Sequence, residues 1–266
     1  MKAIVWQERY SCNFRCPYCT IYKMDDSNRM KDPDRWIDAL NKLSPEIIDI
    51  TGGEPFLNPD LPKIINGLNA KIGLTTNLSV PILKFVTEVN PSKVISMTIS
   101  YHPSQSQLTK DLFISRATLL RSRGFNINVN FVAYPEQLGL IPQLEQLFRA
   151  NGIRFHVDPF AEDENNKFQY SEVEKEFLKM FIGQDREFRI TDQKKNVCCS
   201  GGRDYLQVDP SGDAYRCMTH HLIGIKPIGN IFDENFCLNG GDDPCGHGDI
   251  CGGCDRDKVT ISEQKV

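Results

Sequence analysis

The sequence predicts an α/β protein in which a parallel sheet curls into a partial (β/α)6 barrel around a polar lumen, followed by a small C-terminal module. Three observations support this expectation. Over residues 1–160, short β-rich runs alternate with helical patterns at the spacing of βα units. The later strands of this region alternate apolar and polar side chains. The segment 196–266 is instead rich in Cys and Gly.

The patterns place six strands and five helices in the first region. We expect strands at 3–10, 46–51, 71–76, 93–101, 125–132 and 153–158. We expect helices at 33–43, 60–69, 80–89, 107–123 and 137–150. Proline lies near the first turn of four helices, where its missing N–H costs little, at Pro33, Pro62, Pro81 and Pro142. Gly124 and Gly152 fit C-terminal caps.

The last three strands each have one apolar and one polar face. The apolar sets are Ile95, Met97, Ile99 and Tyr101, then Phe125, Ile127, Val129 and Phe131, then Ile153, Phe155 and Val157. A strand covered by helices on both faces would be apolar almost throughout. Alternation alone also fits an antiparallel sheet that faces water, but the βα rhythm favours helices outside and a polar ligand inside.

The chain divides into three predicted parts. Residues 1–160 form the barrel core, 161–195 a charged helical connector, and 196–266 a small module held by metal. Within the last part, residues 205–215 fit two short strands around a Pro-Ser-Gly-Asp turn.

Charge and hydropathy exclude two classes of partner. The 31 Lys and Arg residues are outnumbered by 35 Asp and Glu, which gives a net charge of -4 and no basic field for nucleic acid. No apolar run approaches the roughly 18 residues that span a bilayer, and the first ten residues lack the apolar core of a signal peptide. We therefore expect a cytoplasmic protein without nucleic acid or membrane partners.

Cysteine usage is unusual for such a chain. Thiols stay reduced in the cytosol, so the 10 cysteines do not predict disulfides. Cys12, Cys16 and Cys19 form one group, and the others lie between Cys198 and Cys254. The first group offers three ligands, which leaves one iron of a four-iron cluster open. A structural zinc ion would need a fourth ligand from elsewhere in space.

The first group follows the predicted first strand as CxxxCxxC, and Thr51-Gly-Gly-Glu-Pro55 follows the second. This combination resembles the radical S-adenosylmethionine (SAM) superfamily. The resemblance implies a 4Fe-4S cluster on the three cysteines, whose open iron binds SAM for reductive cleavage to a 5′-deoxyadenosyl radical. It also implies contacts to SAM: to the methionyl ammonium from Gly52, Gly53 and Glu54, to the ribose or carboxylate from Ser100 and Asn130, and to the adenine from Tyr18.

The second group resembles the SPASM/Twitch extension of this superfamily. Cys199, Gly212 and Cys217 are spaced C-x12-G-x4-C, and Cys251-Gly-Gly-Cys254 follows. The resemblance implies one auxiliary 4Fe-4S cluster, as in the shorter Twitch form, with the ligands Cys199, Cys217, Cys251 and Cys254.

Three cysteines are left over. Cys198 fits the ligand spacing almost as well as Cys199, and Cys237 and Cys245 have no assigned role. A spare thiol beside a cluster is either an inert buried cysteine or a hydrogen-atom donor to a substrate radical, with Cys198 first in line. A zinc ribbon made from Cys245, His247, Cys251 and Cys254 is the alternative for the tail.

The resemblance predicts an enzyme that breaks a carbon–hydrogen bond, and a closed auxiliary cluster favours net oxidation. The arrangement resembles the Twitch-bearing SAM-dependent dehydrogenase of aminocyclitol antibiotic synthesis, in which an alcohol becomes a ketone. Such a reaction needs a base, and the lumen-facing candidates are His102, Arg154, His156 and Asp158. The expected partners are a small-molecule or peptide substrate and a one-electron reductant such as flavodoxin or ferredoxin.

The alternative enzyme is a peptide maturase that epimerises or crosslinks a ribosomal peptide. Such enzymes often carry a leader-binding segment before the first cluster motif, whereas 11 residues precede Cys12 in this sequence. This short segment disfavours the fused form, although a separate partner protein could bind the leader. A third hypothesis is a protein that only carries electrons on its clusters. It gives the GGEP motif and the polar lumen no function.

Overall fold

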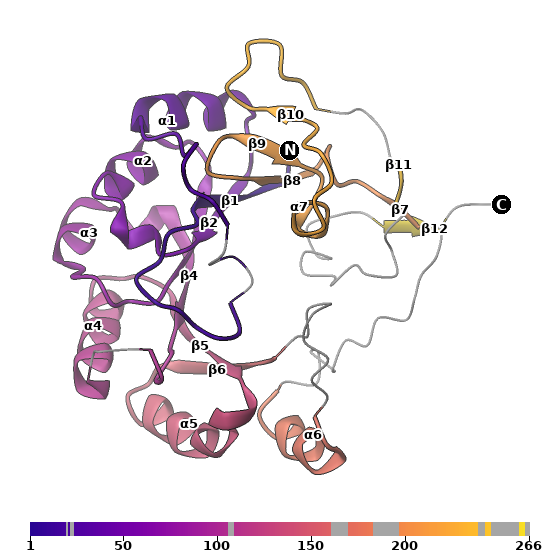
Figure 1. Ribbon diagram of the computed structural model, residues 1–266. Coiled ribbons are helices and arrows are strands. Elements are labelled where there is room, and N and C mark those ends of the chain that lie inside the picture. Colours follow the sequence, from indigo (N-terminus) through magenta and orange to yellow (C-terminus); the bar gives the residue numbers. More distant parts are fainter. Residues whose placement is uncertain are drawn as a thin grey trace.

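One curved sheet organises the protein, with nine strands among the described residues in the order β10-β9-β8-β1-β2-β3-β4-β5-β6 (Figure 1). The structure, a computed structural model, describes residues 1–19, 21, 24–105, 109–160, 170–182, 197–238, 243–245 and 261–263. At 197–198, 243–245 and 261–263 it describes the backbone alone.

The first six strands are parallel and follow the chain order. They are β1 (Ala3–Arg9), β2 (Ile47–Gly52), β3 (Lys71–Thr76), β4 (Val94–Ser100), β5 (Ile127–Ala133) and β6 (Arg154–Pro159). The helices between them are α1 (Pro33–Lys42), α2 (Leu61–Gly67), α3 (Leu83–Glu88), α4 (Lys110–Ser122) and α5 (Ile141–Ala150), with short 3-10 helices η1 (Pro55–Leu57), η2 (Pro91–Lys93) and η3 (Pro135–Leu140). The predicted α/β fold with a partial barrel is confirmed, and the strand bounds lie within two residues of those expected.

Helices α1 to α5 cover the convex face of the sheet (Figure 1). Trp6 of β1 packs on Trp36 of α1 with ring centroids 4.6 Å apart, and both side chains are buried. The apolar residues of β4 and β5 join the same core through Phe113 of α4 and Phe148 of α5. Burial of this face leaves the alternate, polar side chains on the concave face, where they line the lumen.

Helix ends follow the expected signals. Asp32 caps α1 by accepting the backbone N–H of Asp34 at 2.9 Å, and Pro33 occupies the first turn. Gly124 (φ +90°) and Gly152 (φ +65°) follow α4 and α5 in the left-handed region that glycine adopts without strain.

The exception to the strand alternation is Ile95, which is exposed because a bulge shifts the β3–β4 register beside it.

The C-terminal hairpin extends the main sheet. Strands β8 (Tyr205–Val208) and β9 (Asp213–Tyr215) flank the predicted turn, in which Asp209 Oδ1 accepts the backbone N–H groups of Ser211 and Asp213, each at 2.9 Å. Strand β8 pairs in parallel with β1, and β10 (Gly229–Asn230) completes this edge. This part of the tail therefore continues the main sheet beyond β1.

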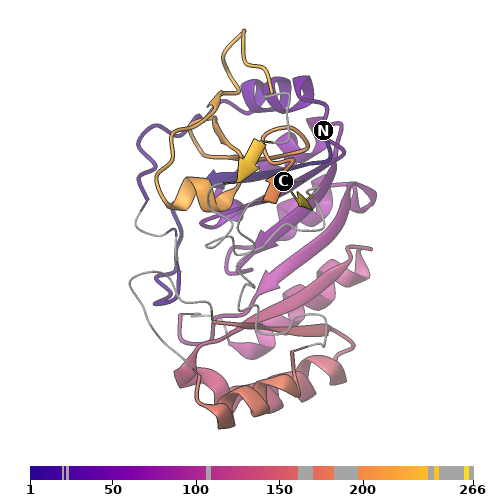
Figure 2. The same cartoon turned by 90° about the vertical axis from the view of Figure 1, so that its right-hand side faces the viewer.

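The remaining elements belong to the connector and the tail. Helix α6 (Glu172–Lys179) begins with a capping box between Ser171 and Glu174. Strand β7 (Val197–Cys199) pairs with β11 (Asp243–Cys245) and β12 (Ile261–Glu263), and α7 (Met218–Leu222) follows β9. Figure 2 shows the tail over the end of the sheet around β1, with α6 beside α5 at the other end. None of the described helices is long and apolar enough to cross a membrane. The predicted domain boundaries stay predictions.

Candidate functional site

The loop after β1 brings three cysteines to one cavity at the carboxyl end of the sheet. The cavity has a volume of about 170 Å³. Its lining includes Tyr10, Cys12, Phe14, Cys16, Tyr18, Cys19, Gly52, Gly53, Asn77, Ser100 and His102. The start of the loop is fixed by Asp26, whose carboxylate accepts the backbone N–H groups of Tyr10 and Ser11, each at 2.8 Å.

A buried carboxylate anchors the strand behind this loop. Glu8 is fully buried and forms ion pairs with Arg9, at 2.6 Å, and with Arg29. Its Oε1 also accepts the Asn58 amide at 2.9 Å. A buried carboxylate needs such partners to remain ionised. The network therefore ties β1 to the segment after the cysteines and to the loop after β2.

The three thiols influence one another. Burial raises the pKa of Cys16 to about 12, and the neighbouring Cys19 and Cys12 add to the rise. Burial also raises the pKa of Cys12, against a smaller effect of the Phe14 backbone N–H. The Asn77 amide lies 3.7 Å from Cys12 Sγ. In the described part of the chain, no three His, Cys, Asp or Glu side chains converge closely enough to hold a single metal ion.

Gly52 and Gly53 allow the loop after β2 to touch the cysteine loop. The backbone N–H of Gly53 donates to the Arg9 carbonyl at 2.7 Å. A Cβ atom would lie 2.2 Å from the Arg9 carbonyl oxygen at Gly52, which has φ +119°, and 2.0 Å from the Ser11 carbonyl oxygen at Gly53. Only glycine permits this approach, so the pair is more than an ordinary turn.

Glu54 has a place that the sequence did not predict. Its side chain is fully buried behind the cavity, and both carboxylate oxygens already accept protein hydrogen bonds. Oε1 accepts Thr76 Oγ1 at 2.7 Å and the Phe56 N–H at 3.0 Å, and Oε2 accepts the Asn77 N–H at 2.7 Å. These bonds join the ends of β2 and β3. A contact from Glu54 to the methionyl ammonium stays a prediction.

Tyr18 belongs to an aromatic cluster on the far side of the cavity. Its hydroxyl lies 2.8 Å from His102 Nδ1, and its ring contacts Tyr134 at 5.2 Å between centroids. Gln137, in the 3-10 helix η3 that follows β5, lies close enough to the Tyr18 hydroxyl to act on its pKa. The Gln137 side chain is buried, and among the described residues neither of its amide atoms has a hydrogen-bond partner. An amide left unpaired in this way indicates a polar partner in the functional state.

His102 should make the apo protein sensitive to acid. Burial lowers its pKa from 6.5 to about 4, so between these values the unfolded chain binds a proton that the folded chain does not. Stability is therefore lost as the pH falls from about 6.5 to about 4, by up to about 3 kcal/mol from this group. Urea unfolding should show this loss in the wild type and a smaller one in His102→Asn. Equal acid sensitivity in the two proteins would contradict the assignment.

Three predicted lumen residues form one row across β4, β5 and β6. Ser100 pairs in register with Asn130, and Asn130 pairs with His156. Asn130 Oδ1 is buried and has no hydrogen-bond partner among the residues described. His156 Nε2 lies 3.2 Å from Asp158 Oδ1, although the two atoms lack hydrogen-bond alignment. The row therefore places a hydroxyl, an amide and an imidazole on neighbouring strands.

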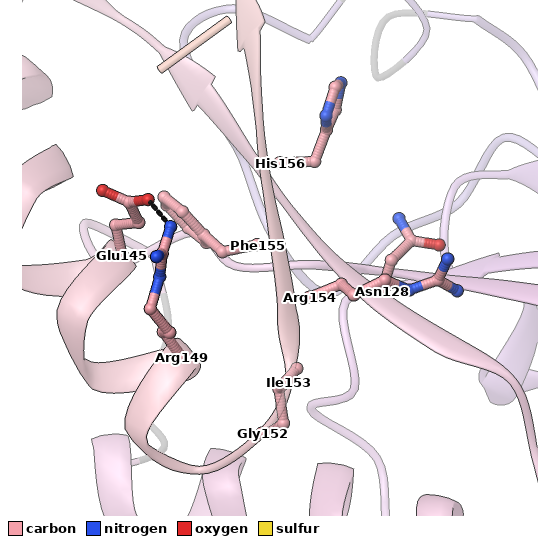
Figure 3. Close-up of a pocket in the computed structure, with 8 residues that line it drawn as sticks. All are labelled: Asn128, Glu145, Arg149, Gly152, Ile153, Arg154, Phe155 and His156. Atoms are coloured by element: carbon pink, nitrogen blue, oxygen red, sulfur yellow. Dashed lines mark hydrogen bonds and ion pairs between the residues drawn. The ribbon is translucent and has the colours of Figure 1, made fainter. Parts of the chain in front are cut away.

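Arg154 lies apart from this row, near the beginning of β6. Its guanidinium donates to Asn126 Oδ1 at 2.6 Å. Together with Asn128 and His156 it lines a second, open pocket of about 650 Å³ that also reaches Arg149 on the other side of the strand (Figure 3). A guanidinium does not give up its proton in proteins, so Arg154 suits binding of an anionic group better than a role as a base.

The structure describes two of the four predicted auxiliary ligands. Cys199 Sγ accepts the Gly201 N–H at 3.4 Å, and Arg216 binds the carbonyl oxygens of Gly201 and Cys199 at 3.0 and 3.1 Å. Cys217 follows Arg216 directly, so the chain holds Cys199 and Cys217 in one neighbourhood. Cys251 and Cys254 lie outside the described residues, as does the side chain of Cys198. Cys237 is exposed.

Residues 10–137 match the family model of the Radical SAM superfamily. The chain is 36% identical over 73 residues to GTP 3′,8-cyclase 1 of Mycobacterium tuberculosis. This match covers 25% of this chain and 20% of the cyclase. It therefore spans about a fifth of that relative's length.

Two solved structures share the fold of this chain. Streptococcus suis SuiB bound to precursor peptide SuiA has 18% identity and a TM-score of 0.68, with 88% of this chain and 63% of that chain covered. The structure of anSMEcpe with bound AdoMet has 16% identity and a TM-score of 0.62, with 87% and 78% covered. At these identities the likeness shows the fold alone.

The residues at the cavity fit a SAM-binding iron-sulfur cluster. Three buried or half-buried thiols supply a sulfur donor set, and the glycine pair leaves its backbone open to a close approach. The unpaired Asn130 Oδ1 offers an acceptor for a ligand donor in the lumen. The sequence did not single out Asn77 or Gln137. Asn77 follows β3 directly, so its place at the carboxyl end of a parallel strand was the available signal.

Proposed function

We propose that this chain is a radical SAM enzyme that abstracts a hydrogen atom from its substrate. The proposed outcome is oxidation of the substrate from an alcohol to a ketone. The observation that carries the proposal is the cavity in which Cys12, Cys16 and Cys19 meet the Gly52–Gly53 backbone. When bound, a three-thiolate 4Fe-4S cluster with SAM would supply one-electron reductive cleavage, and a second cluster in the tail would accept one electron.

The residues of the chain would bind and orient SAM. Gly52 and Gly53 offer backbone at the methionine end, and Ser100 and Asn130 offer polar side chains on the neighbouring strands. Tyr18, with Gln137 beside it, offers a ring and an amide for the base. With SAM bound, the walls of the cavity would have to exclude water, because a reactive carbon radical needs protection from side reactions.

The proposed alcohol oxidation needs a proton acceptor, which we assign to the lumen. Removal of a hydrogen atom from the carbon, of one electron and of the hydroxyl proton balances the conversion of an alcohol to a ketone. We assign His156 as the proton acceptor, because it shares the lumen row with Asn130 and its Nε2 lies 3.2 Å from Asp158 Oδ1. His102 is a weaker candidate, since its burial and low pKa oppose protonation. The electron would leave towards Cys199 and Cys217, and an external protein such as flavodoxin or ferredoxin would supply the electron for SAM cleavage.

A peptide substrate is the second candidate. It is favoured by the likeness to SuiB, whose structure holds the precursor peptide SuiA. The open pocket at β6 adds room for an extended chain, because it borders the edge strand of the main sheet. In this case the outcome would be epimerisation or crosslinking, with a spare thiol such as Cys198 as the hydrogen donor for epimerisation.

The distinguishing experiment uses the reduced holoenzyme with SAM in deuterated water. Candidate polar alcohols and peptides are incubated, and products are read by mass spectrometry. Oxidation predicts a product two mass units lighter with no deuterium fixed on the reacting carbon. Replacement of Cys251 or Cys254 with alanine should then leave release of 5′-deoxyadenosine within about threefold of the wild type while the oxidised product disappears.

Cys237→Ala is the matched control, since this exposed cysteine should change neither readout. Carbon-bound deuterium at an unchanged oxidation level, with Cys198→Ala as the sensitive variant, would instead establish the epimerase. Zinc in the tail, or about four irons per chain in place of about eight, would contradict the auxiliary cluster.

A further inference from the structure

A hydrogen bond joins the cysteine cavity to the tail across the sequence. The Tyr10 hydroxyl, from the cavity wall, lies 2.9 Å from His221 Nε2 on α7. Tyr10 is 6% exposed and precedes Cys12 by two residues. His221 follows Cys217 by four residues and stacks on Tyr215, with ring centroids 4.4 Å apart and planes 25° apart. The contact thus connects the loops that carry the two predicted sulfur sites.

The direction of this hydrogen bond follows from the two groups. Among the described residues, the Tyr10 hydroxyl has His221 Nε2 as its hydrogen-bond partner, and a phenol hydroxyl has a hydrogen to donate. If Nε2 donated instead, both the hydroxyl hydrogen and Nδ1 would be left without a partner, so we take the hydroxyl as the donor. A neutral imidazole has one donor and one acceptor. Because Nε2 accepts from Tyr10, Nδ1 carries the hydrogen.

This Nδ1–H group is the unexplained feature. Nδ1 is buried and has no hydrogen-bond partner in the described residues. A buried donor without an acceptor costs about 1–3 kcal/mol, so a partner is expected in the functional state. The helix places that partner, because Cys217 is the N-cap of α7 and His221 lies one turn later. The His221 N–H donates to the Cys217 carbonyl at 3.3 Å, and helical side chains tilt towards the N-terminus, here towards Cys217.

We propose that Tyr10 and His221 form a positioning pair in which Tyr10 holds the His221 ring so that Nδ1–H donates a hydrogen bond to the sulfur atoms of an iron-sulfur cluster at Cys217. This inference rests on the auxiliary cluster of the proposed function. A hydrogen bond to cluster sulfur stabilises the reduced, more negative state and raises the reduction potential. A residue of the SAM cavity wall would thereby help the tail accept an electron.

The test measures the tail cluster alone. In full-length protein with Cys12, Cys16 and Cys19 replaced by alanine, the remaining cluster is titrated with a reductant and followed by electron paramagnetic resonance. His221→Phe keeps the stack on Tyr215 and removes both ring nitrogens. Tyr10→Phe keeps the ring and removes only the hydroxyl. Tyr18→Phe is the matched control, because its hydroxyl faces the same cavity and bonds to His102 instead.

We expect His221→Phe to lower the ratio of reduced to oxidised cluster at fixed potential about tenfold, which is 59 mV for a one-electron couple. Tyr10→Phe should lower it about threefold, because the freed imidazole then samples both tautomers. Tyr18→Phe should leave the ratio unchanged. Loss of iron from the tail cluster in Tyr10→Phe, with iron kept in Tyr18→Phe, would also support the contact between Tyr10 and His221.

The contrary outcomes separate the two proposals. An unchanged ratio in His221→Phe and Tyr10→Phe, with normal iron content, would overturn the positioning pair and leave the proposed function standing. An equal effect of Tyr18→Phe would overturn it too, since the effect would not follow the contact. A parent protein without tail iron would refute the auxiliary cluster, and the positioning pair with it.

Discussion

Replacing Cys12, Cys16 and Cys19 together with alanine is expected to abolish release of 5′-deoxyadenosine from SAM. These thiols are the sulfur donors that line the cavity, and no other cysteine of the described chain is in its lining. Without them the protein cannot hold the open iron that the proposed reaction needs. Activity should fall below detection, at least about 1,000-fold, because the unassisted cleavage has no comparable route. The measurement is product release by anaerobic protein after reconstitution and reduction.

Two comparisons make this result specific. Cys237→Ala, at an exposed position outside the cavity, should keep full cleavage. Iron in the triple variant should fall from about eight to about four per chain, while a cluster signal from the tail persists. SAM cleavage that survives in the triple variant would refute the assignment of the first site.

The barrel was predictable because its signals are local. Alternating side chains, prolines at helix starts and glycines after α4 and α5 each act within a few residues, and these patterns located the six parallel strands. The pairing of β8 with β1 was not predictable in this way. Their register, Val5 opposite Gln207, joins residues about two hundred positions apart, and the short apolar run of β8 fits any sheet edge.

In the candidate site, too, local motifs were predictable and contacts between distant segments were not. The cysteines and the glycine pair stand in contiguous motifs, so sequence spacing was sufficient to find them. Glu54 stood in the same motif, yet its buried bonds to Thr76 and Asn77 depend on how β2 and β3 pack. Gln137 and His221 carry no local signal, since a single Gln or His on a helix has many structural uses. Only the fold reveals that their buried polar atoms lack partners.

Gly53→Ala is expected to damage the site almost as severely as loss of the cysteines. The new Cβ would lie 2.0 Å from the Ser11 carbonyl oxygen and 2.6 Å from that of Tyr10. Both are backbone atoms, so no side-chain rotation relieves the clash, and the cysteine loop must move away. Overpacking of this kind costs about 1–3 kcal/mol of stability. A displacement of about 1 Å at a reacting centre can cost about 100-fold in rate, and we expect at least that loss of 5′-deoxyadenosine release.

Gly139→Ala is the matched control, because no atom lies within 4 Å of its added Cβ and its backbone needs no positive φ. This variant should keep cleavage within about twofold and gain up to about 1 kcal/mol of stability through the unfolded chain. Urea unfolding and SAM cleavage are measured on both proteins in parallel. Wild-type cleavage by Gly53→Ala would mean that the cysteine loop does not need its contact with β2, and that the Gly52–Gly53 backbone does not set the geometry of the cavity.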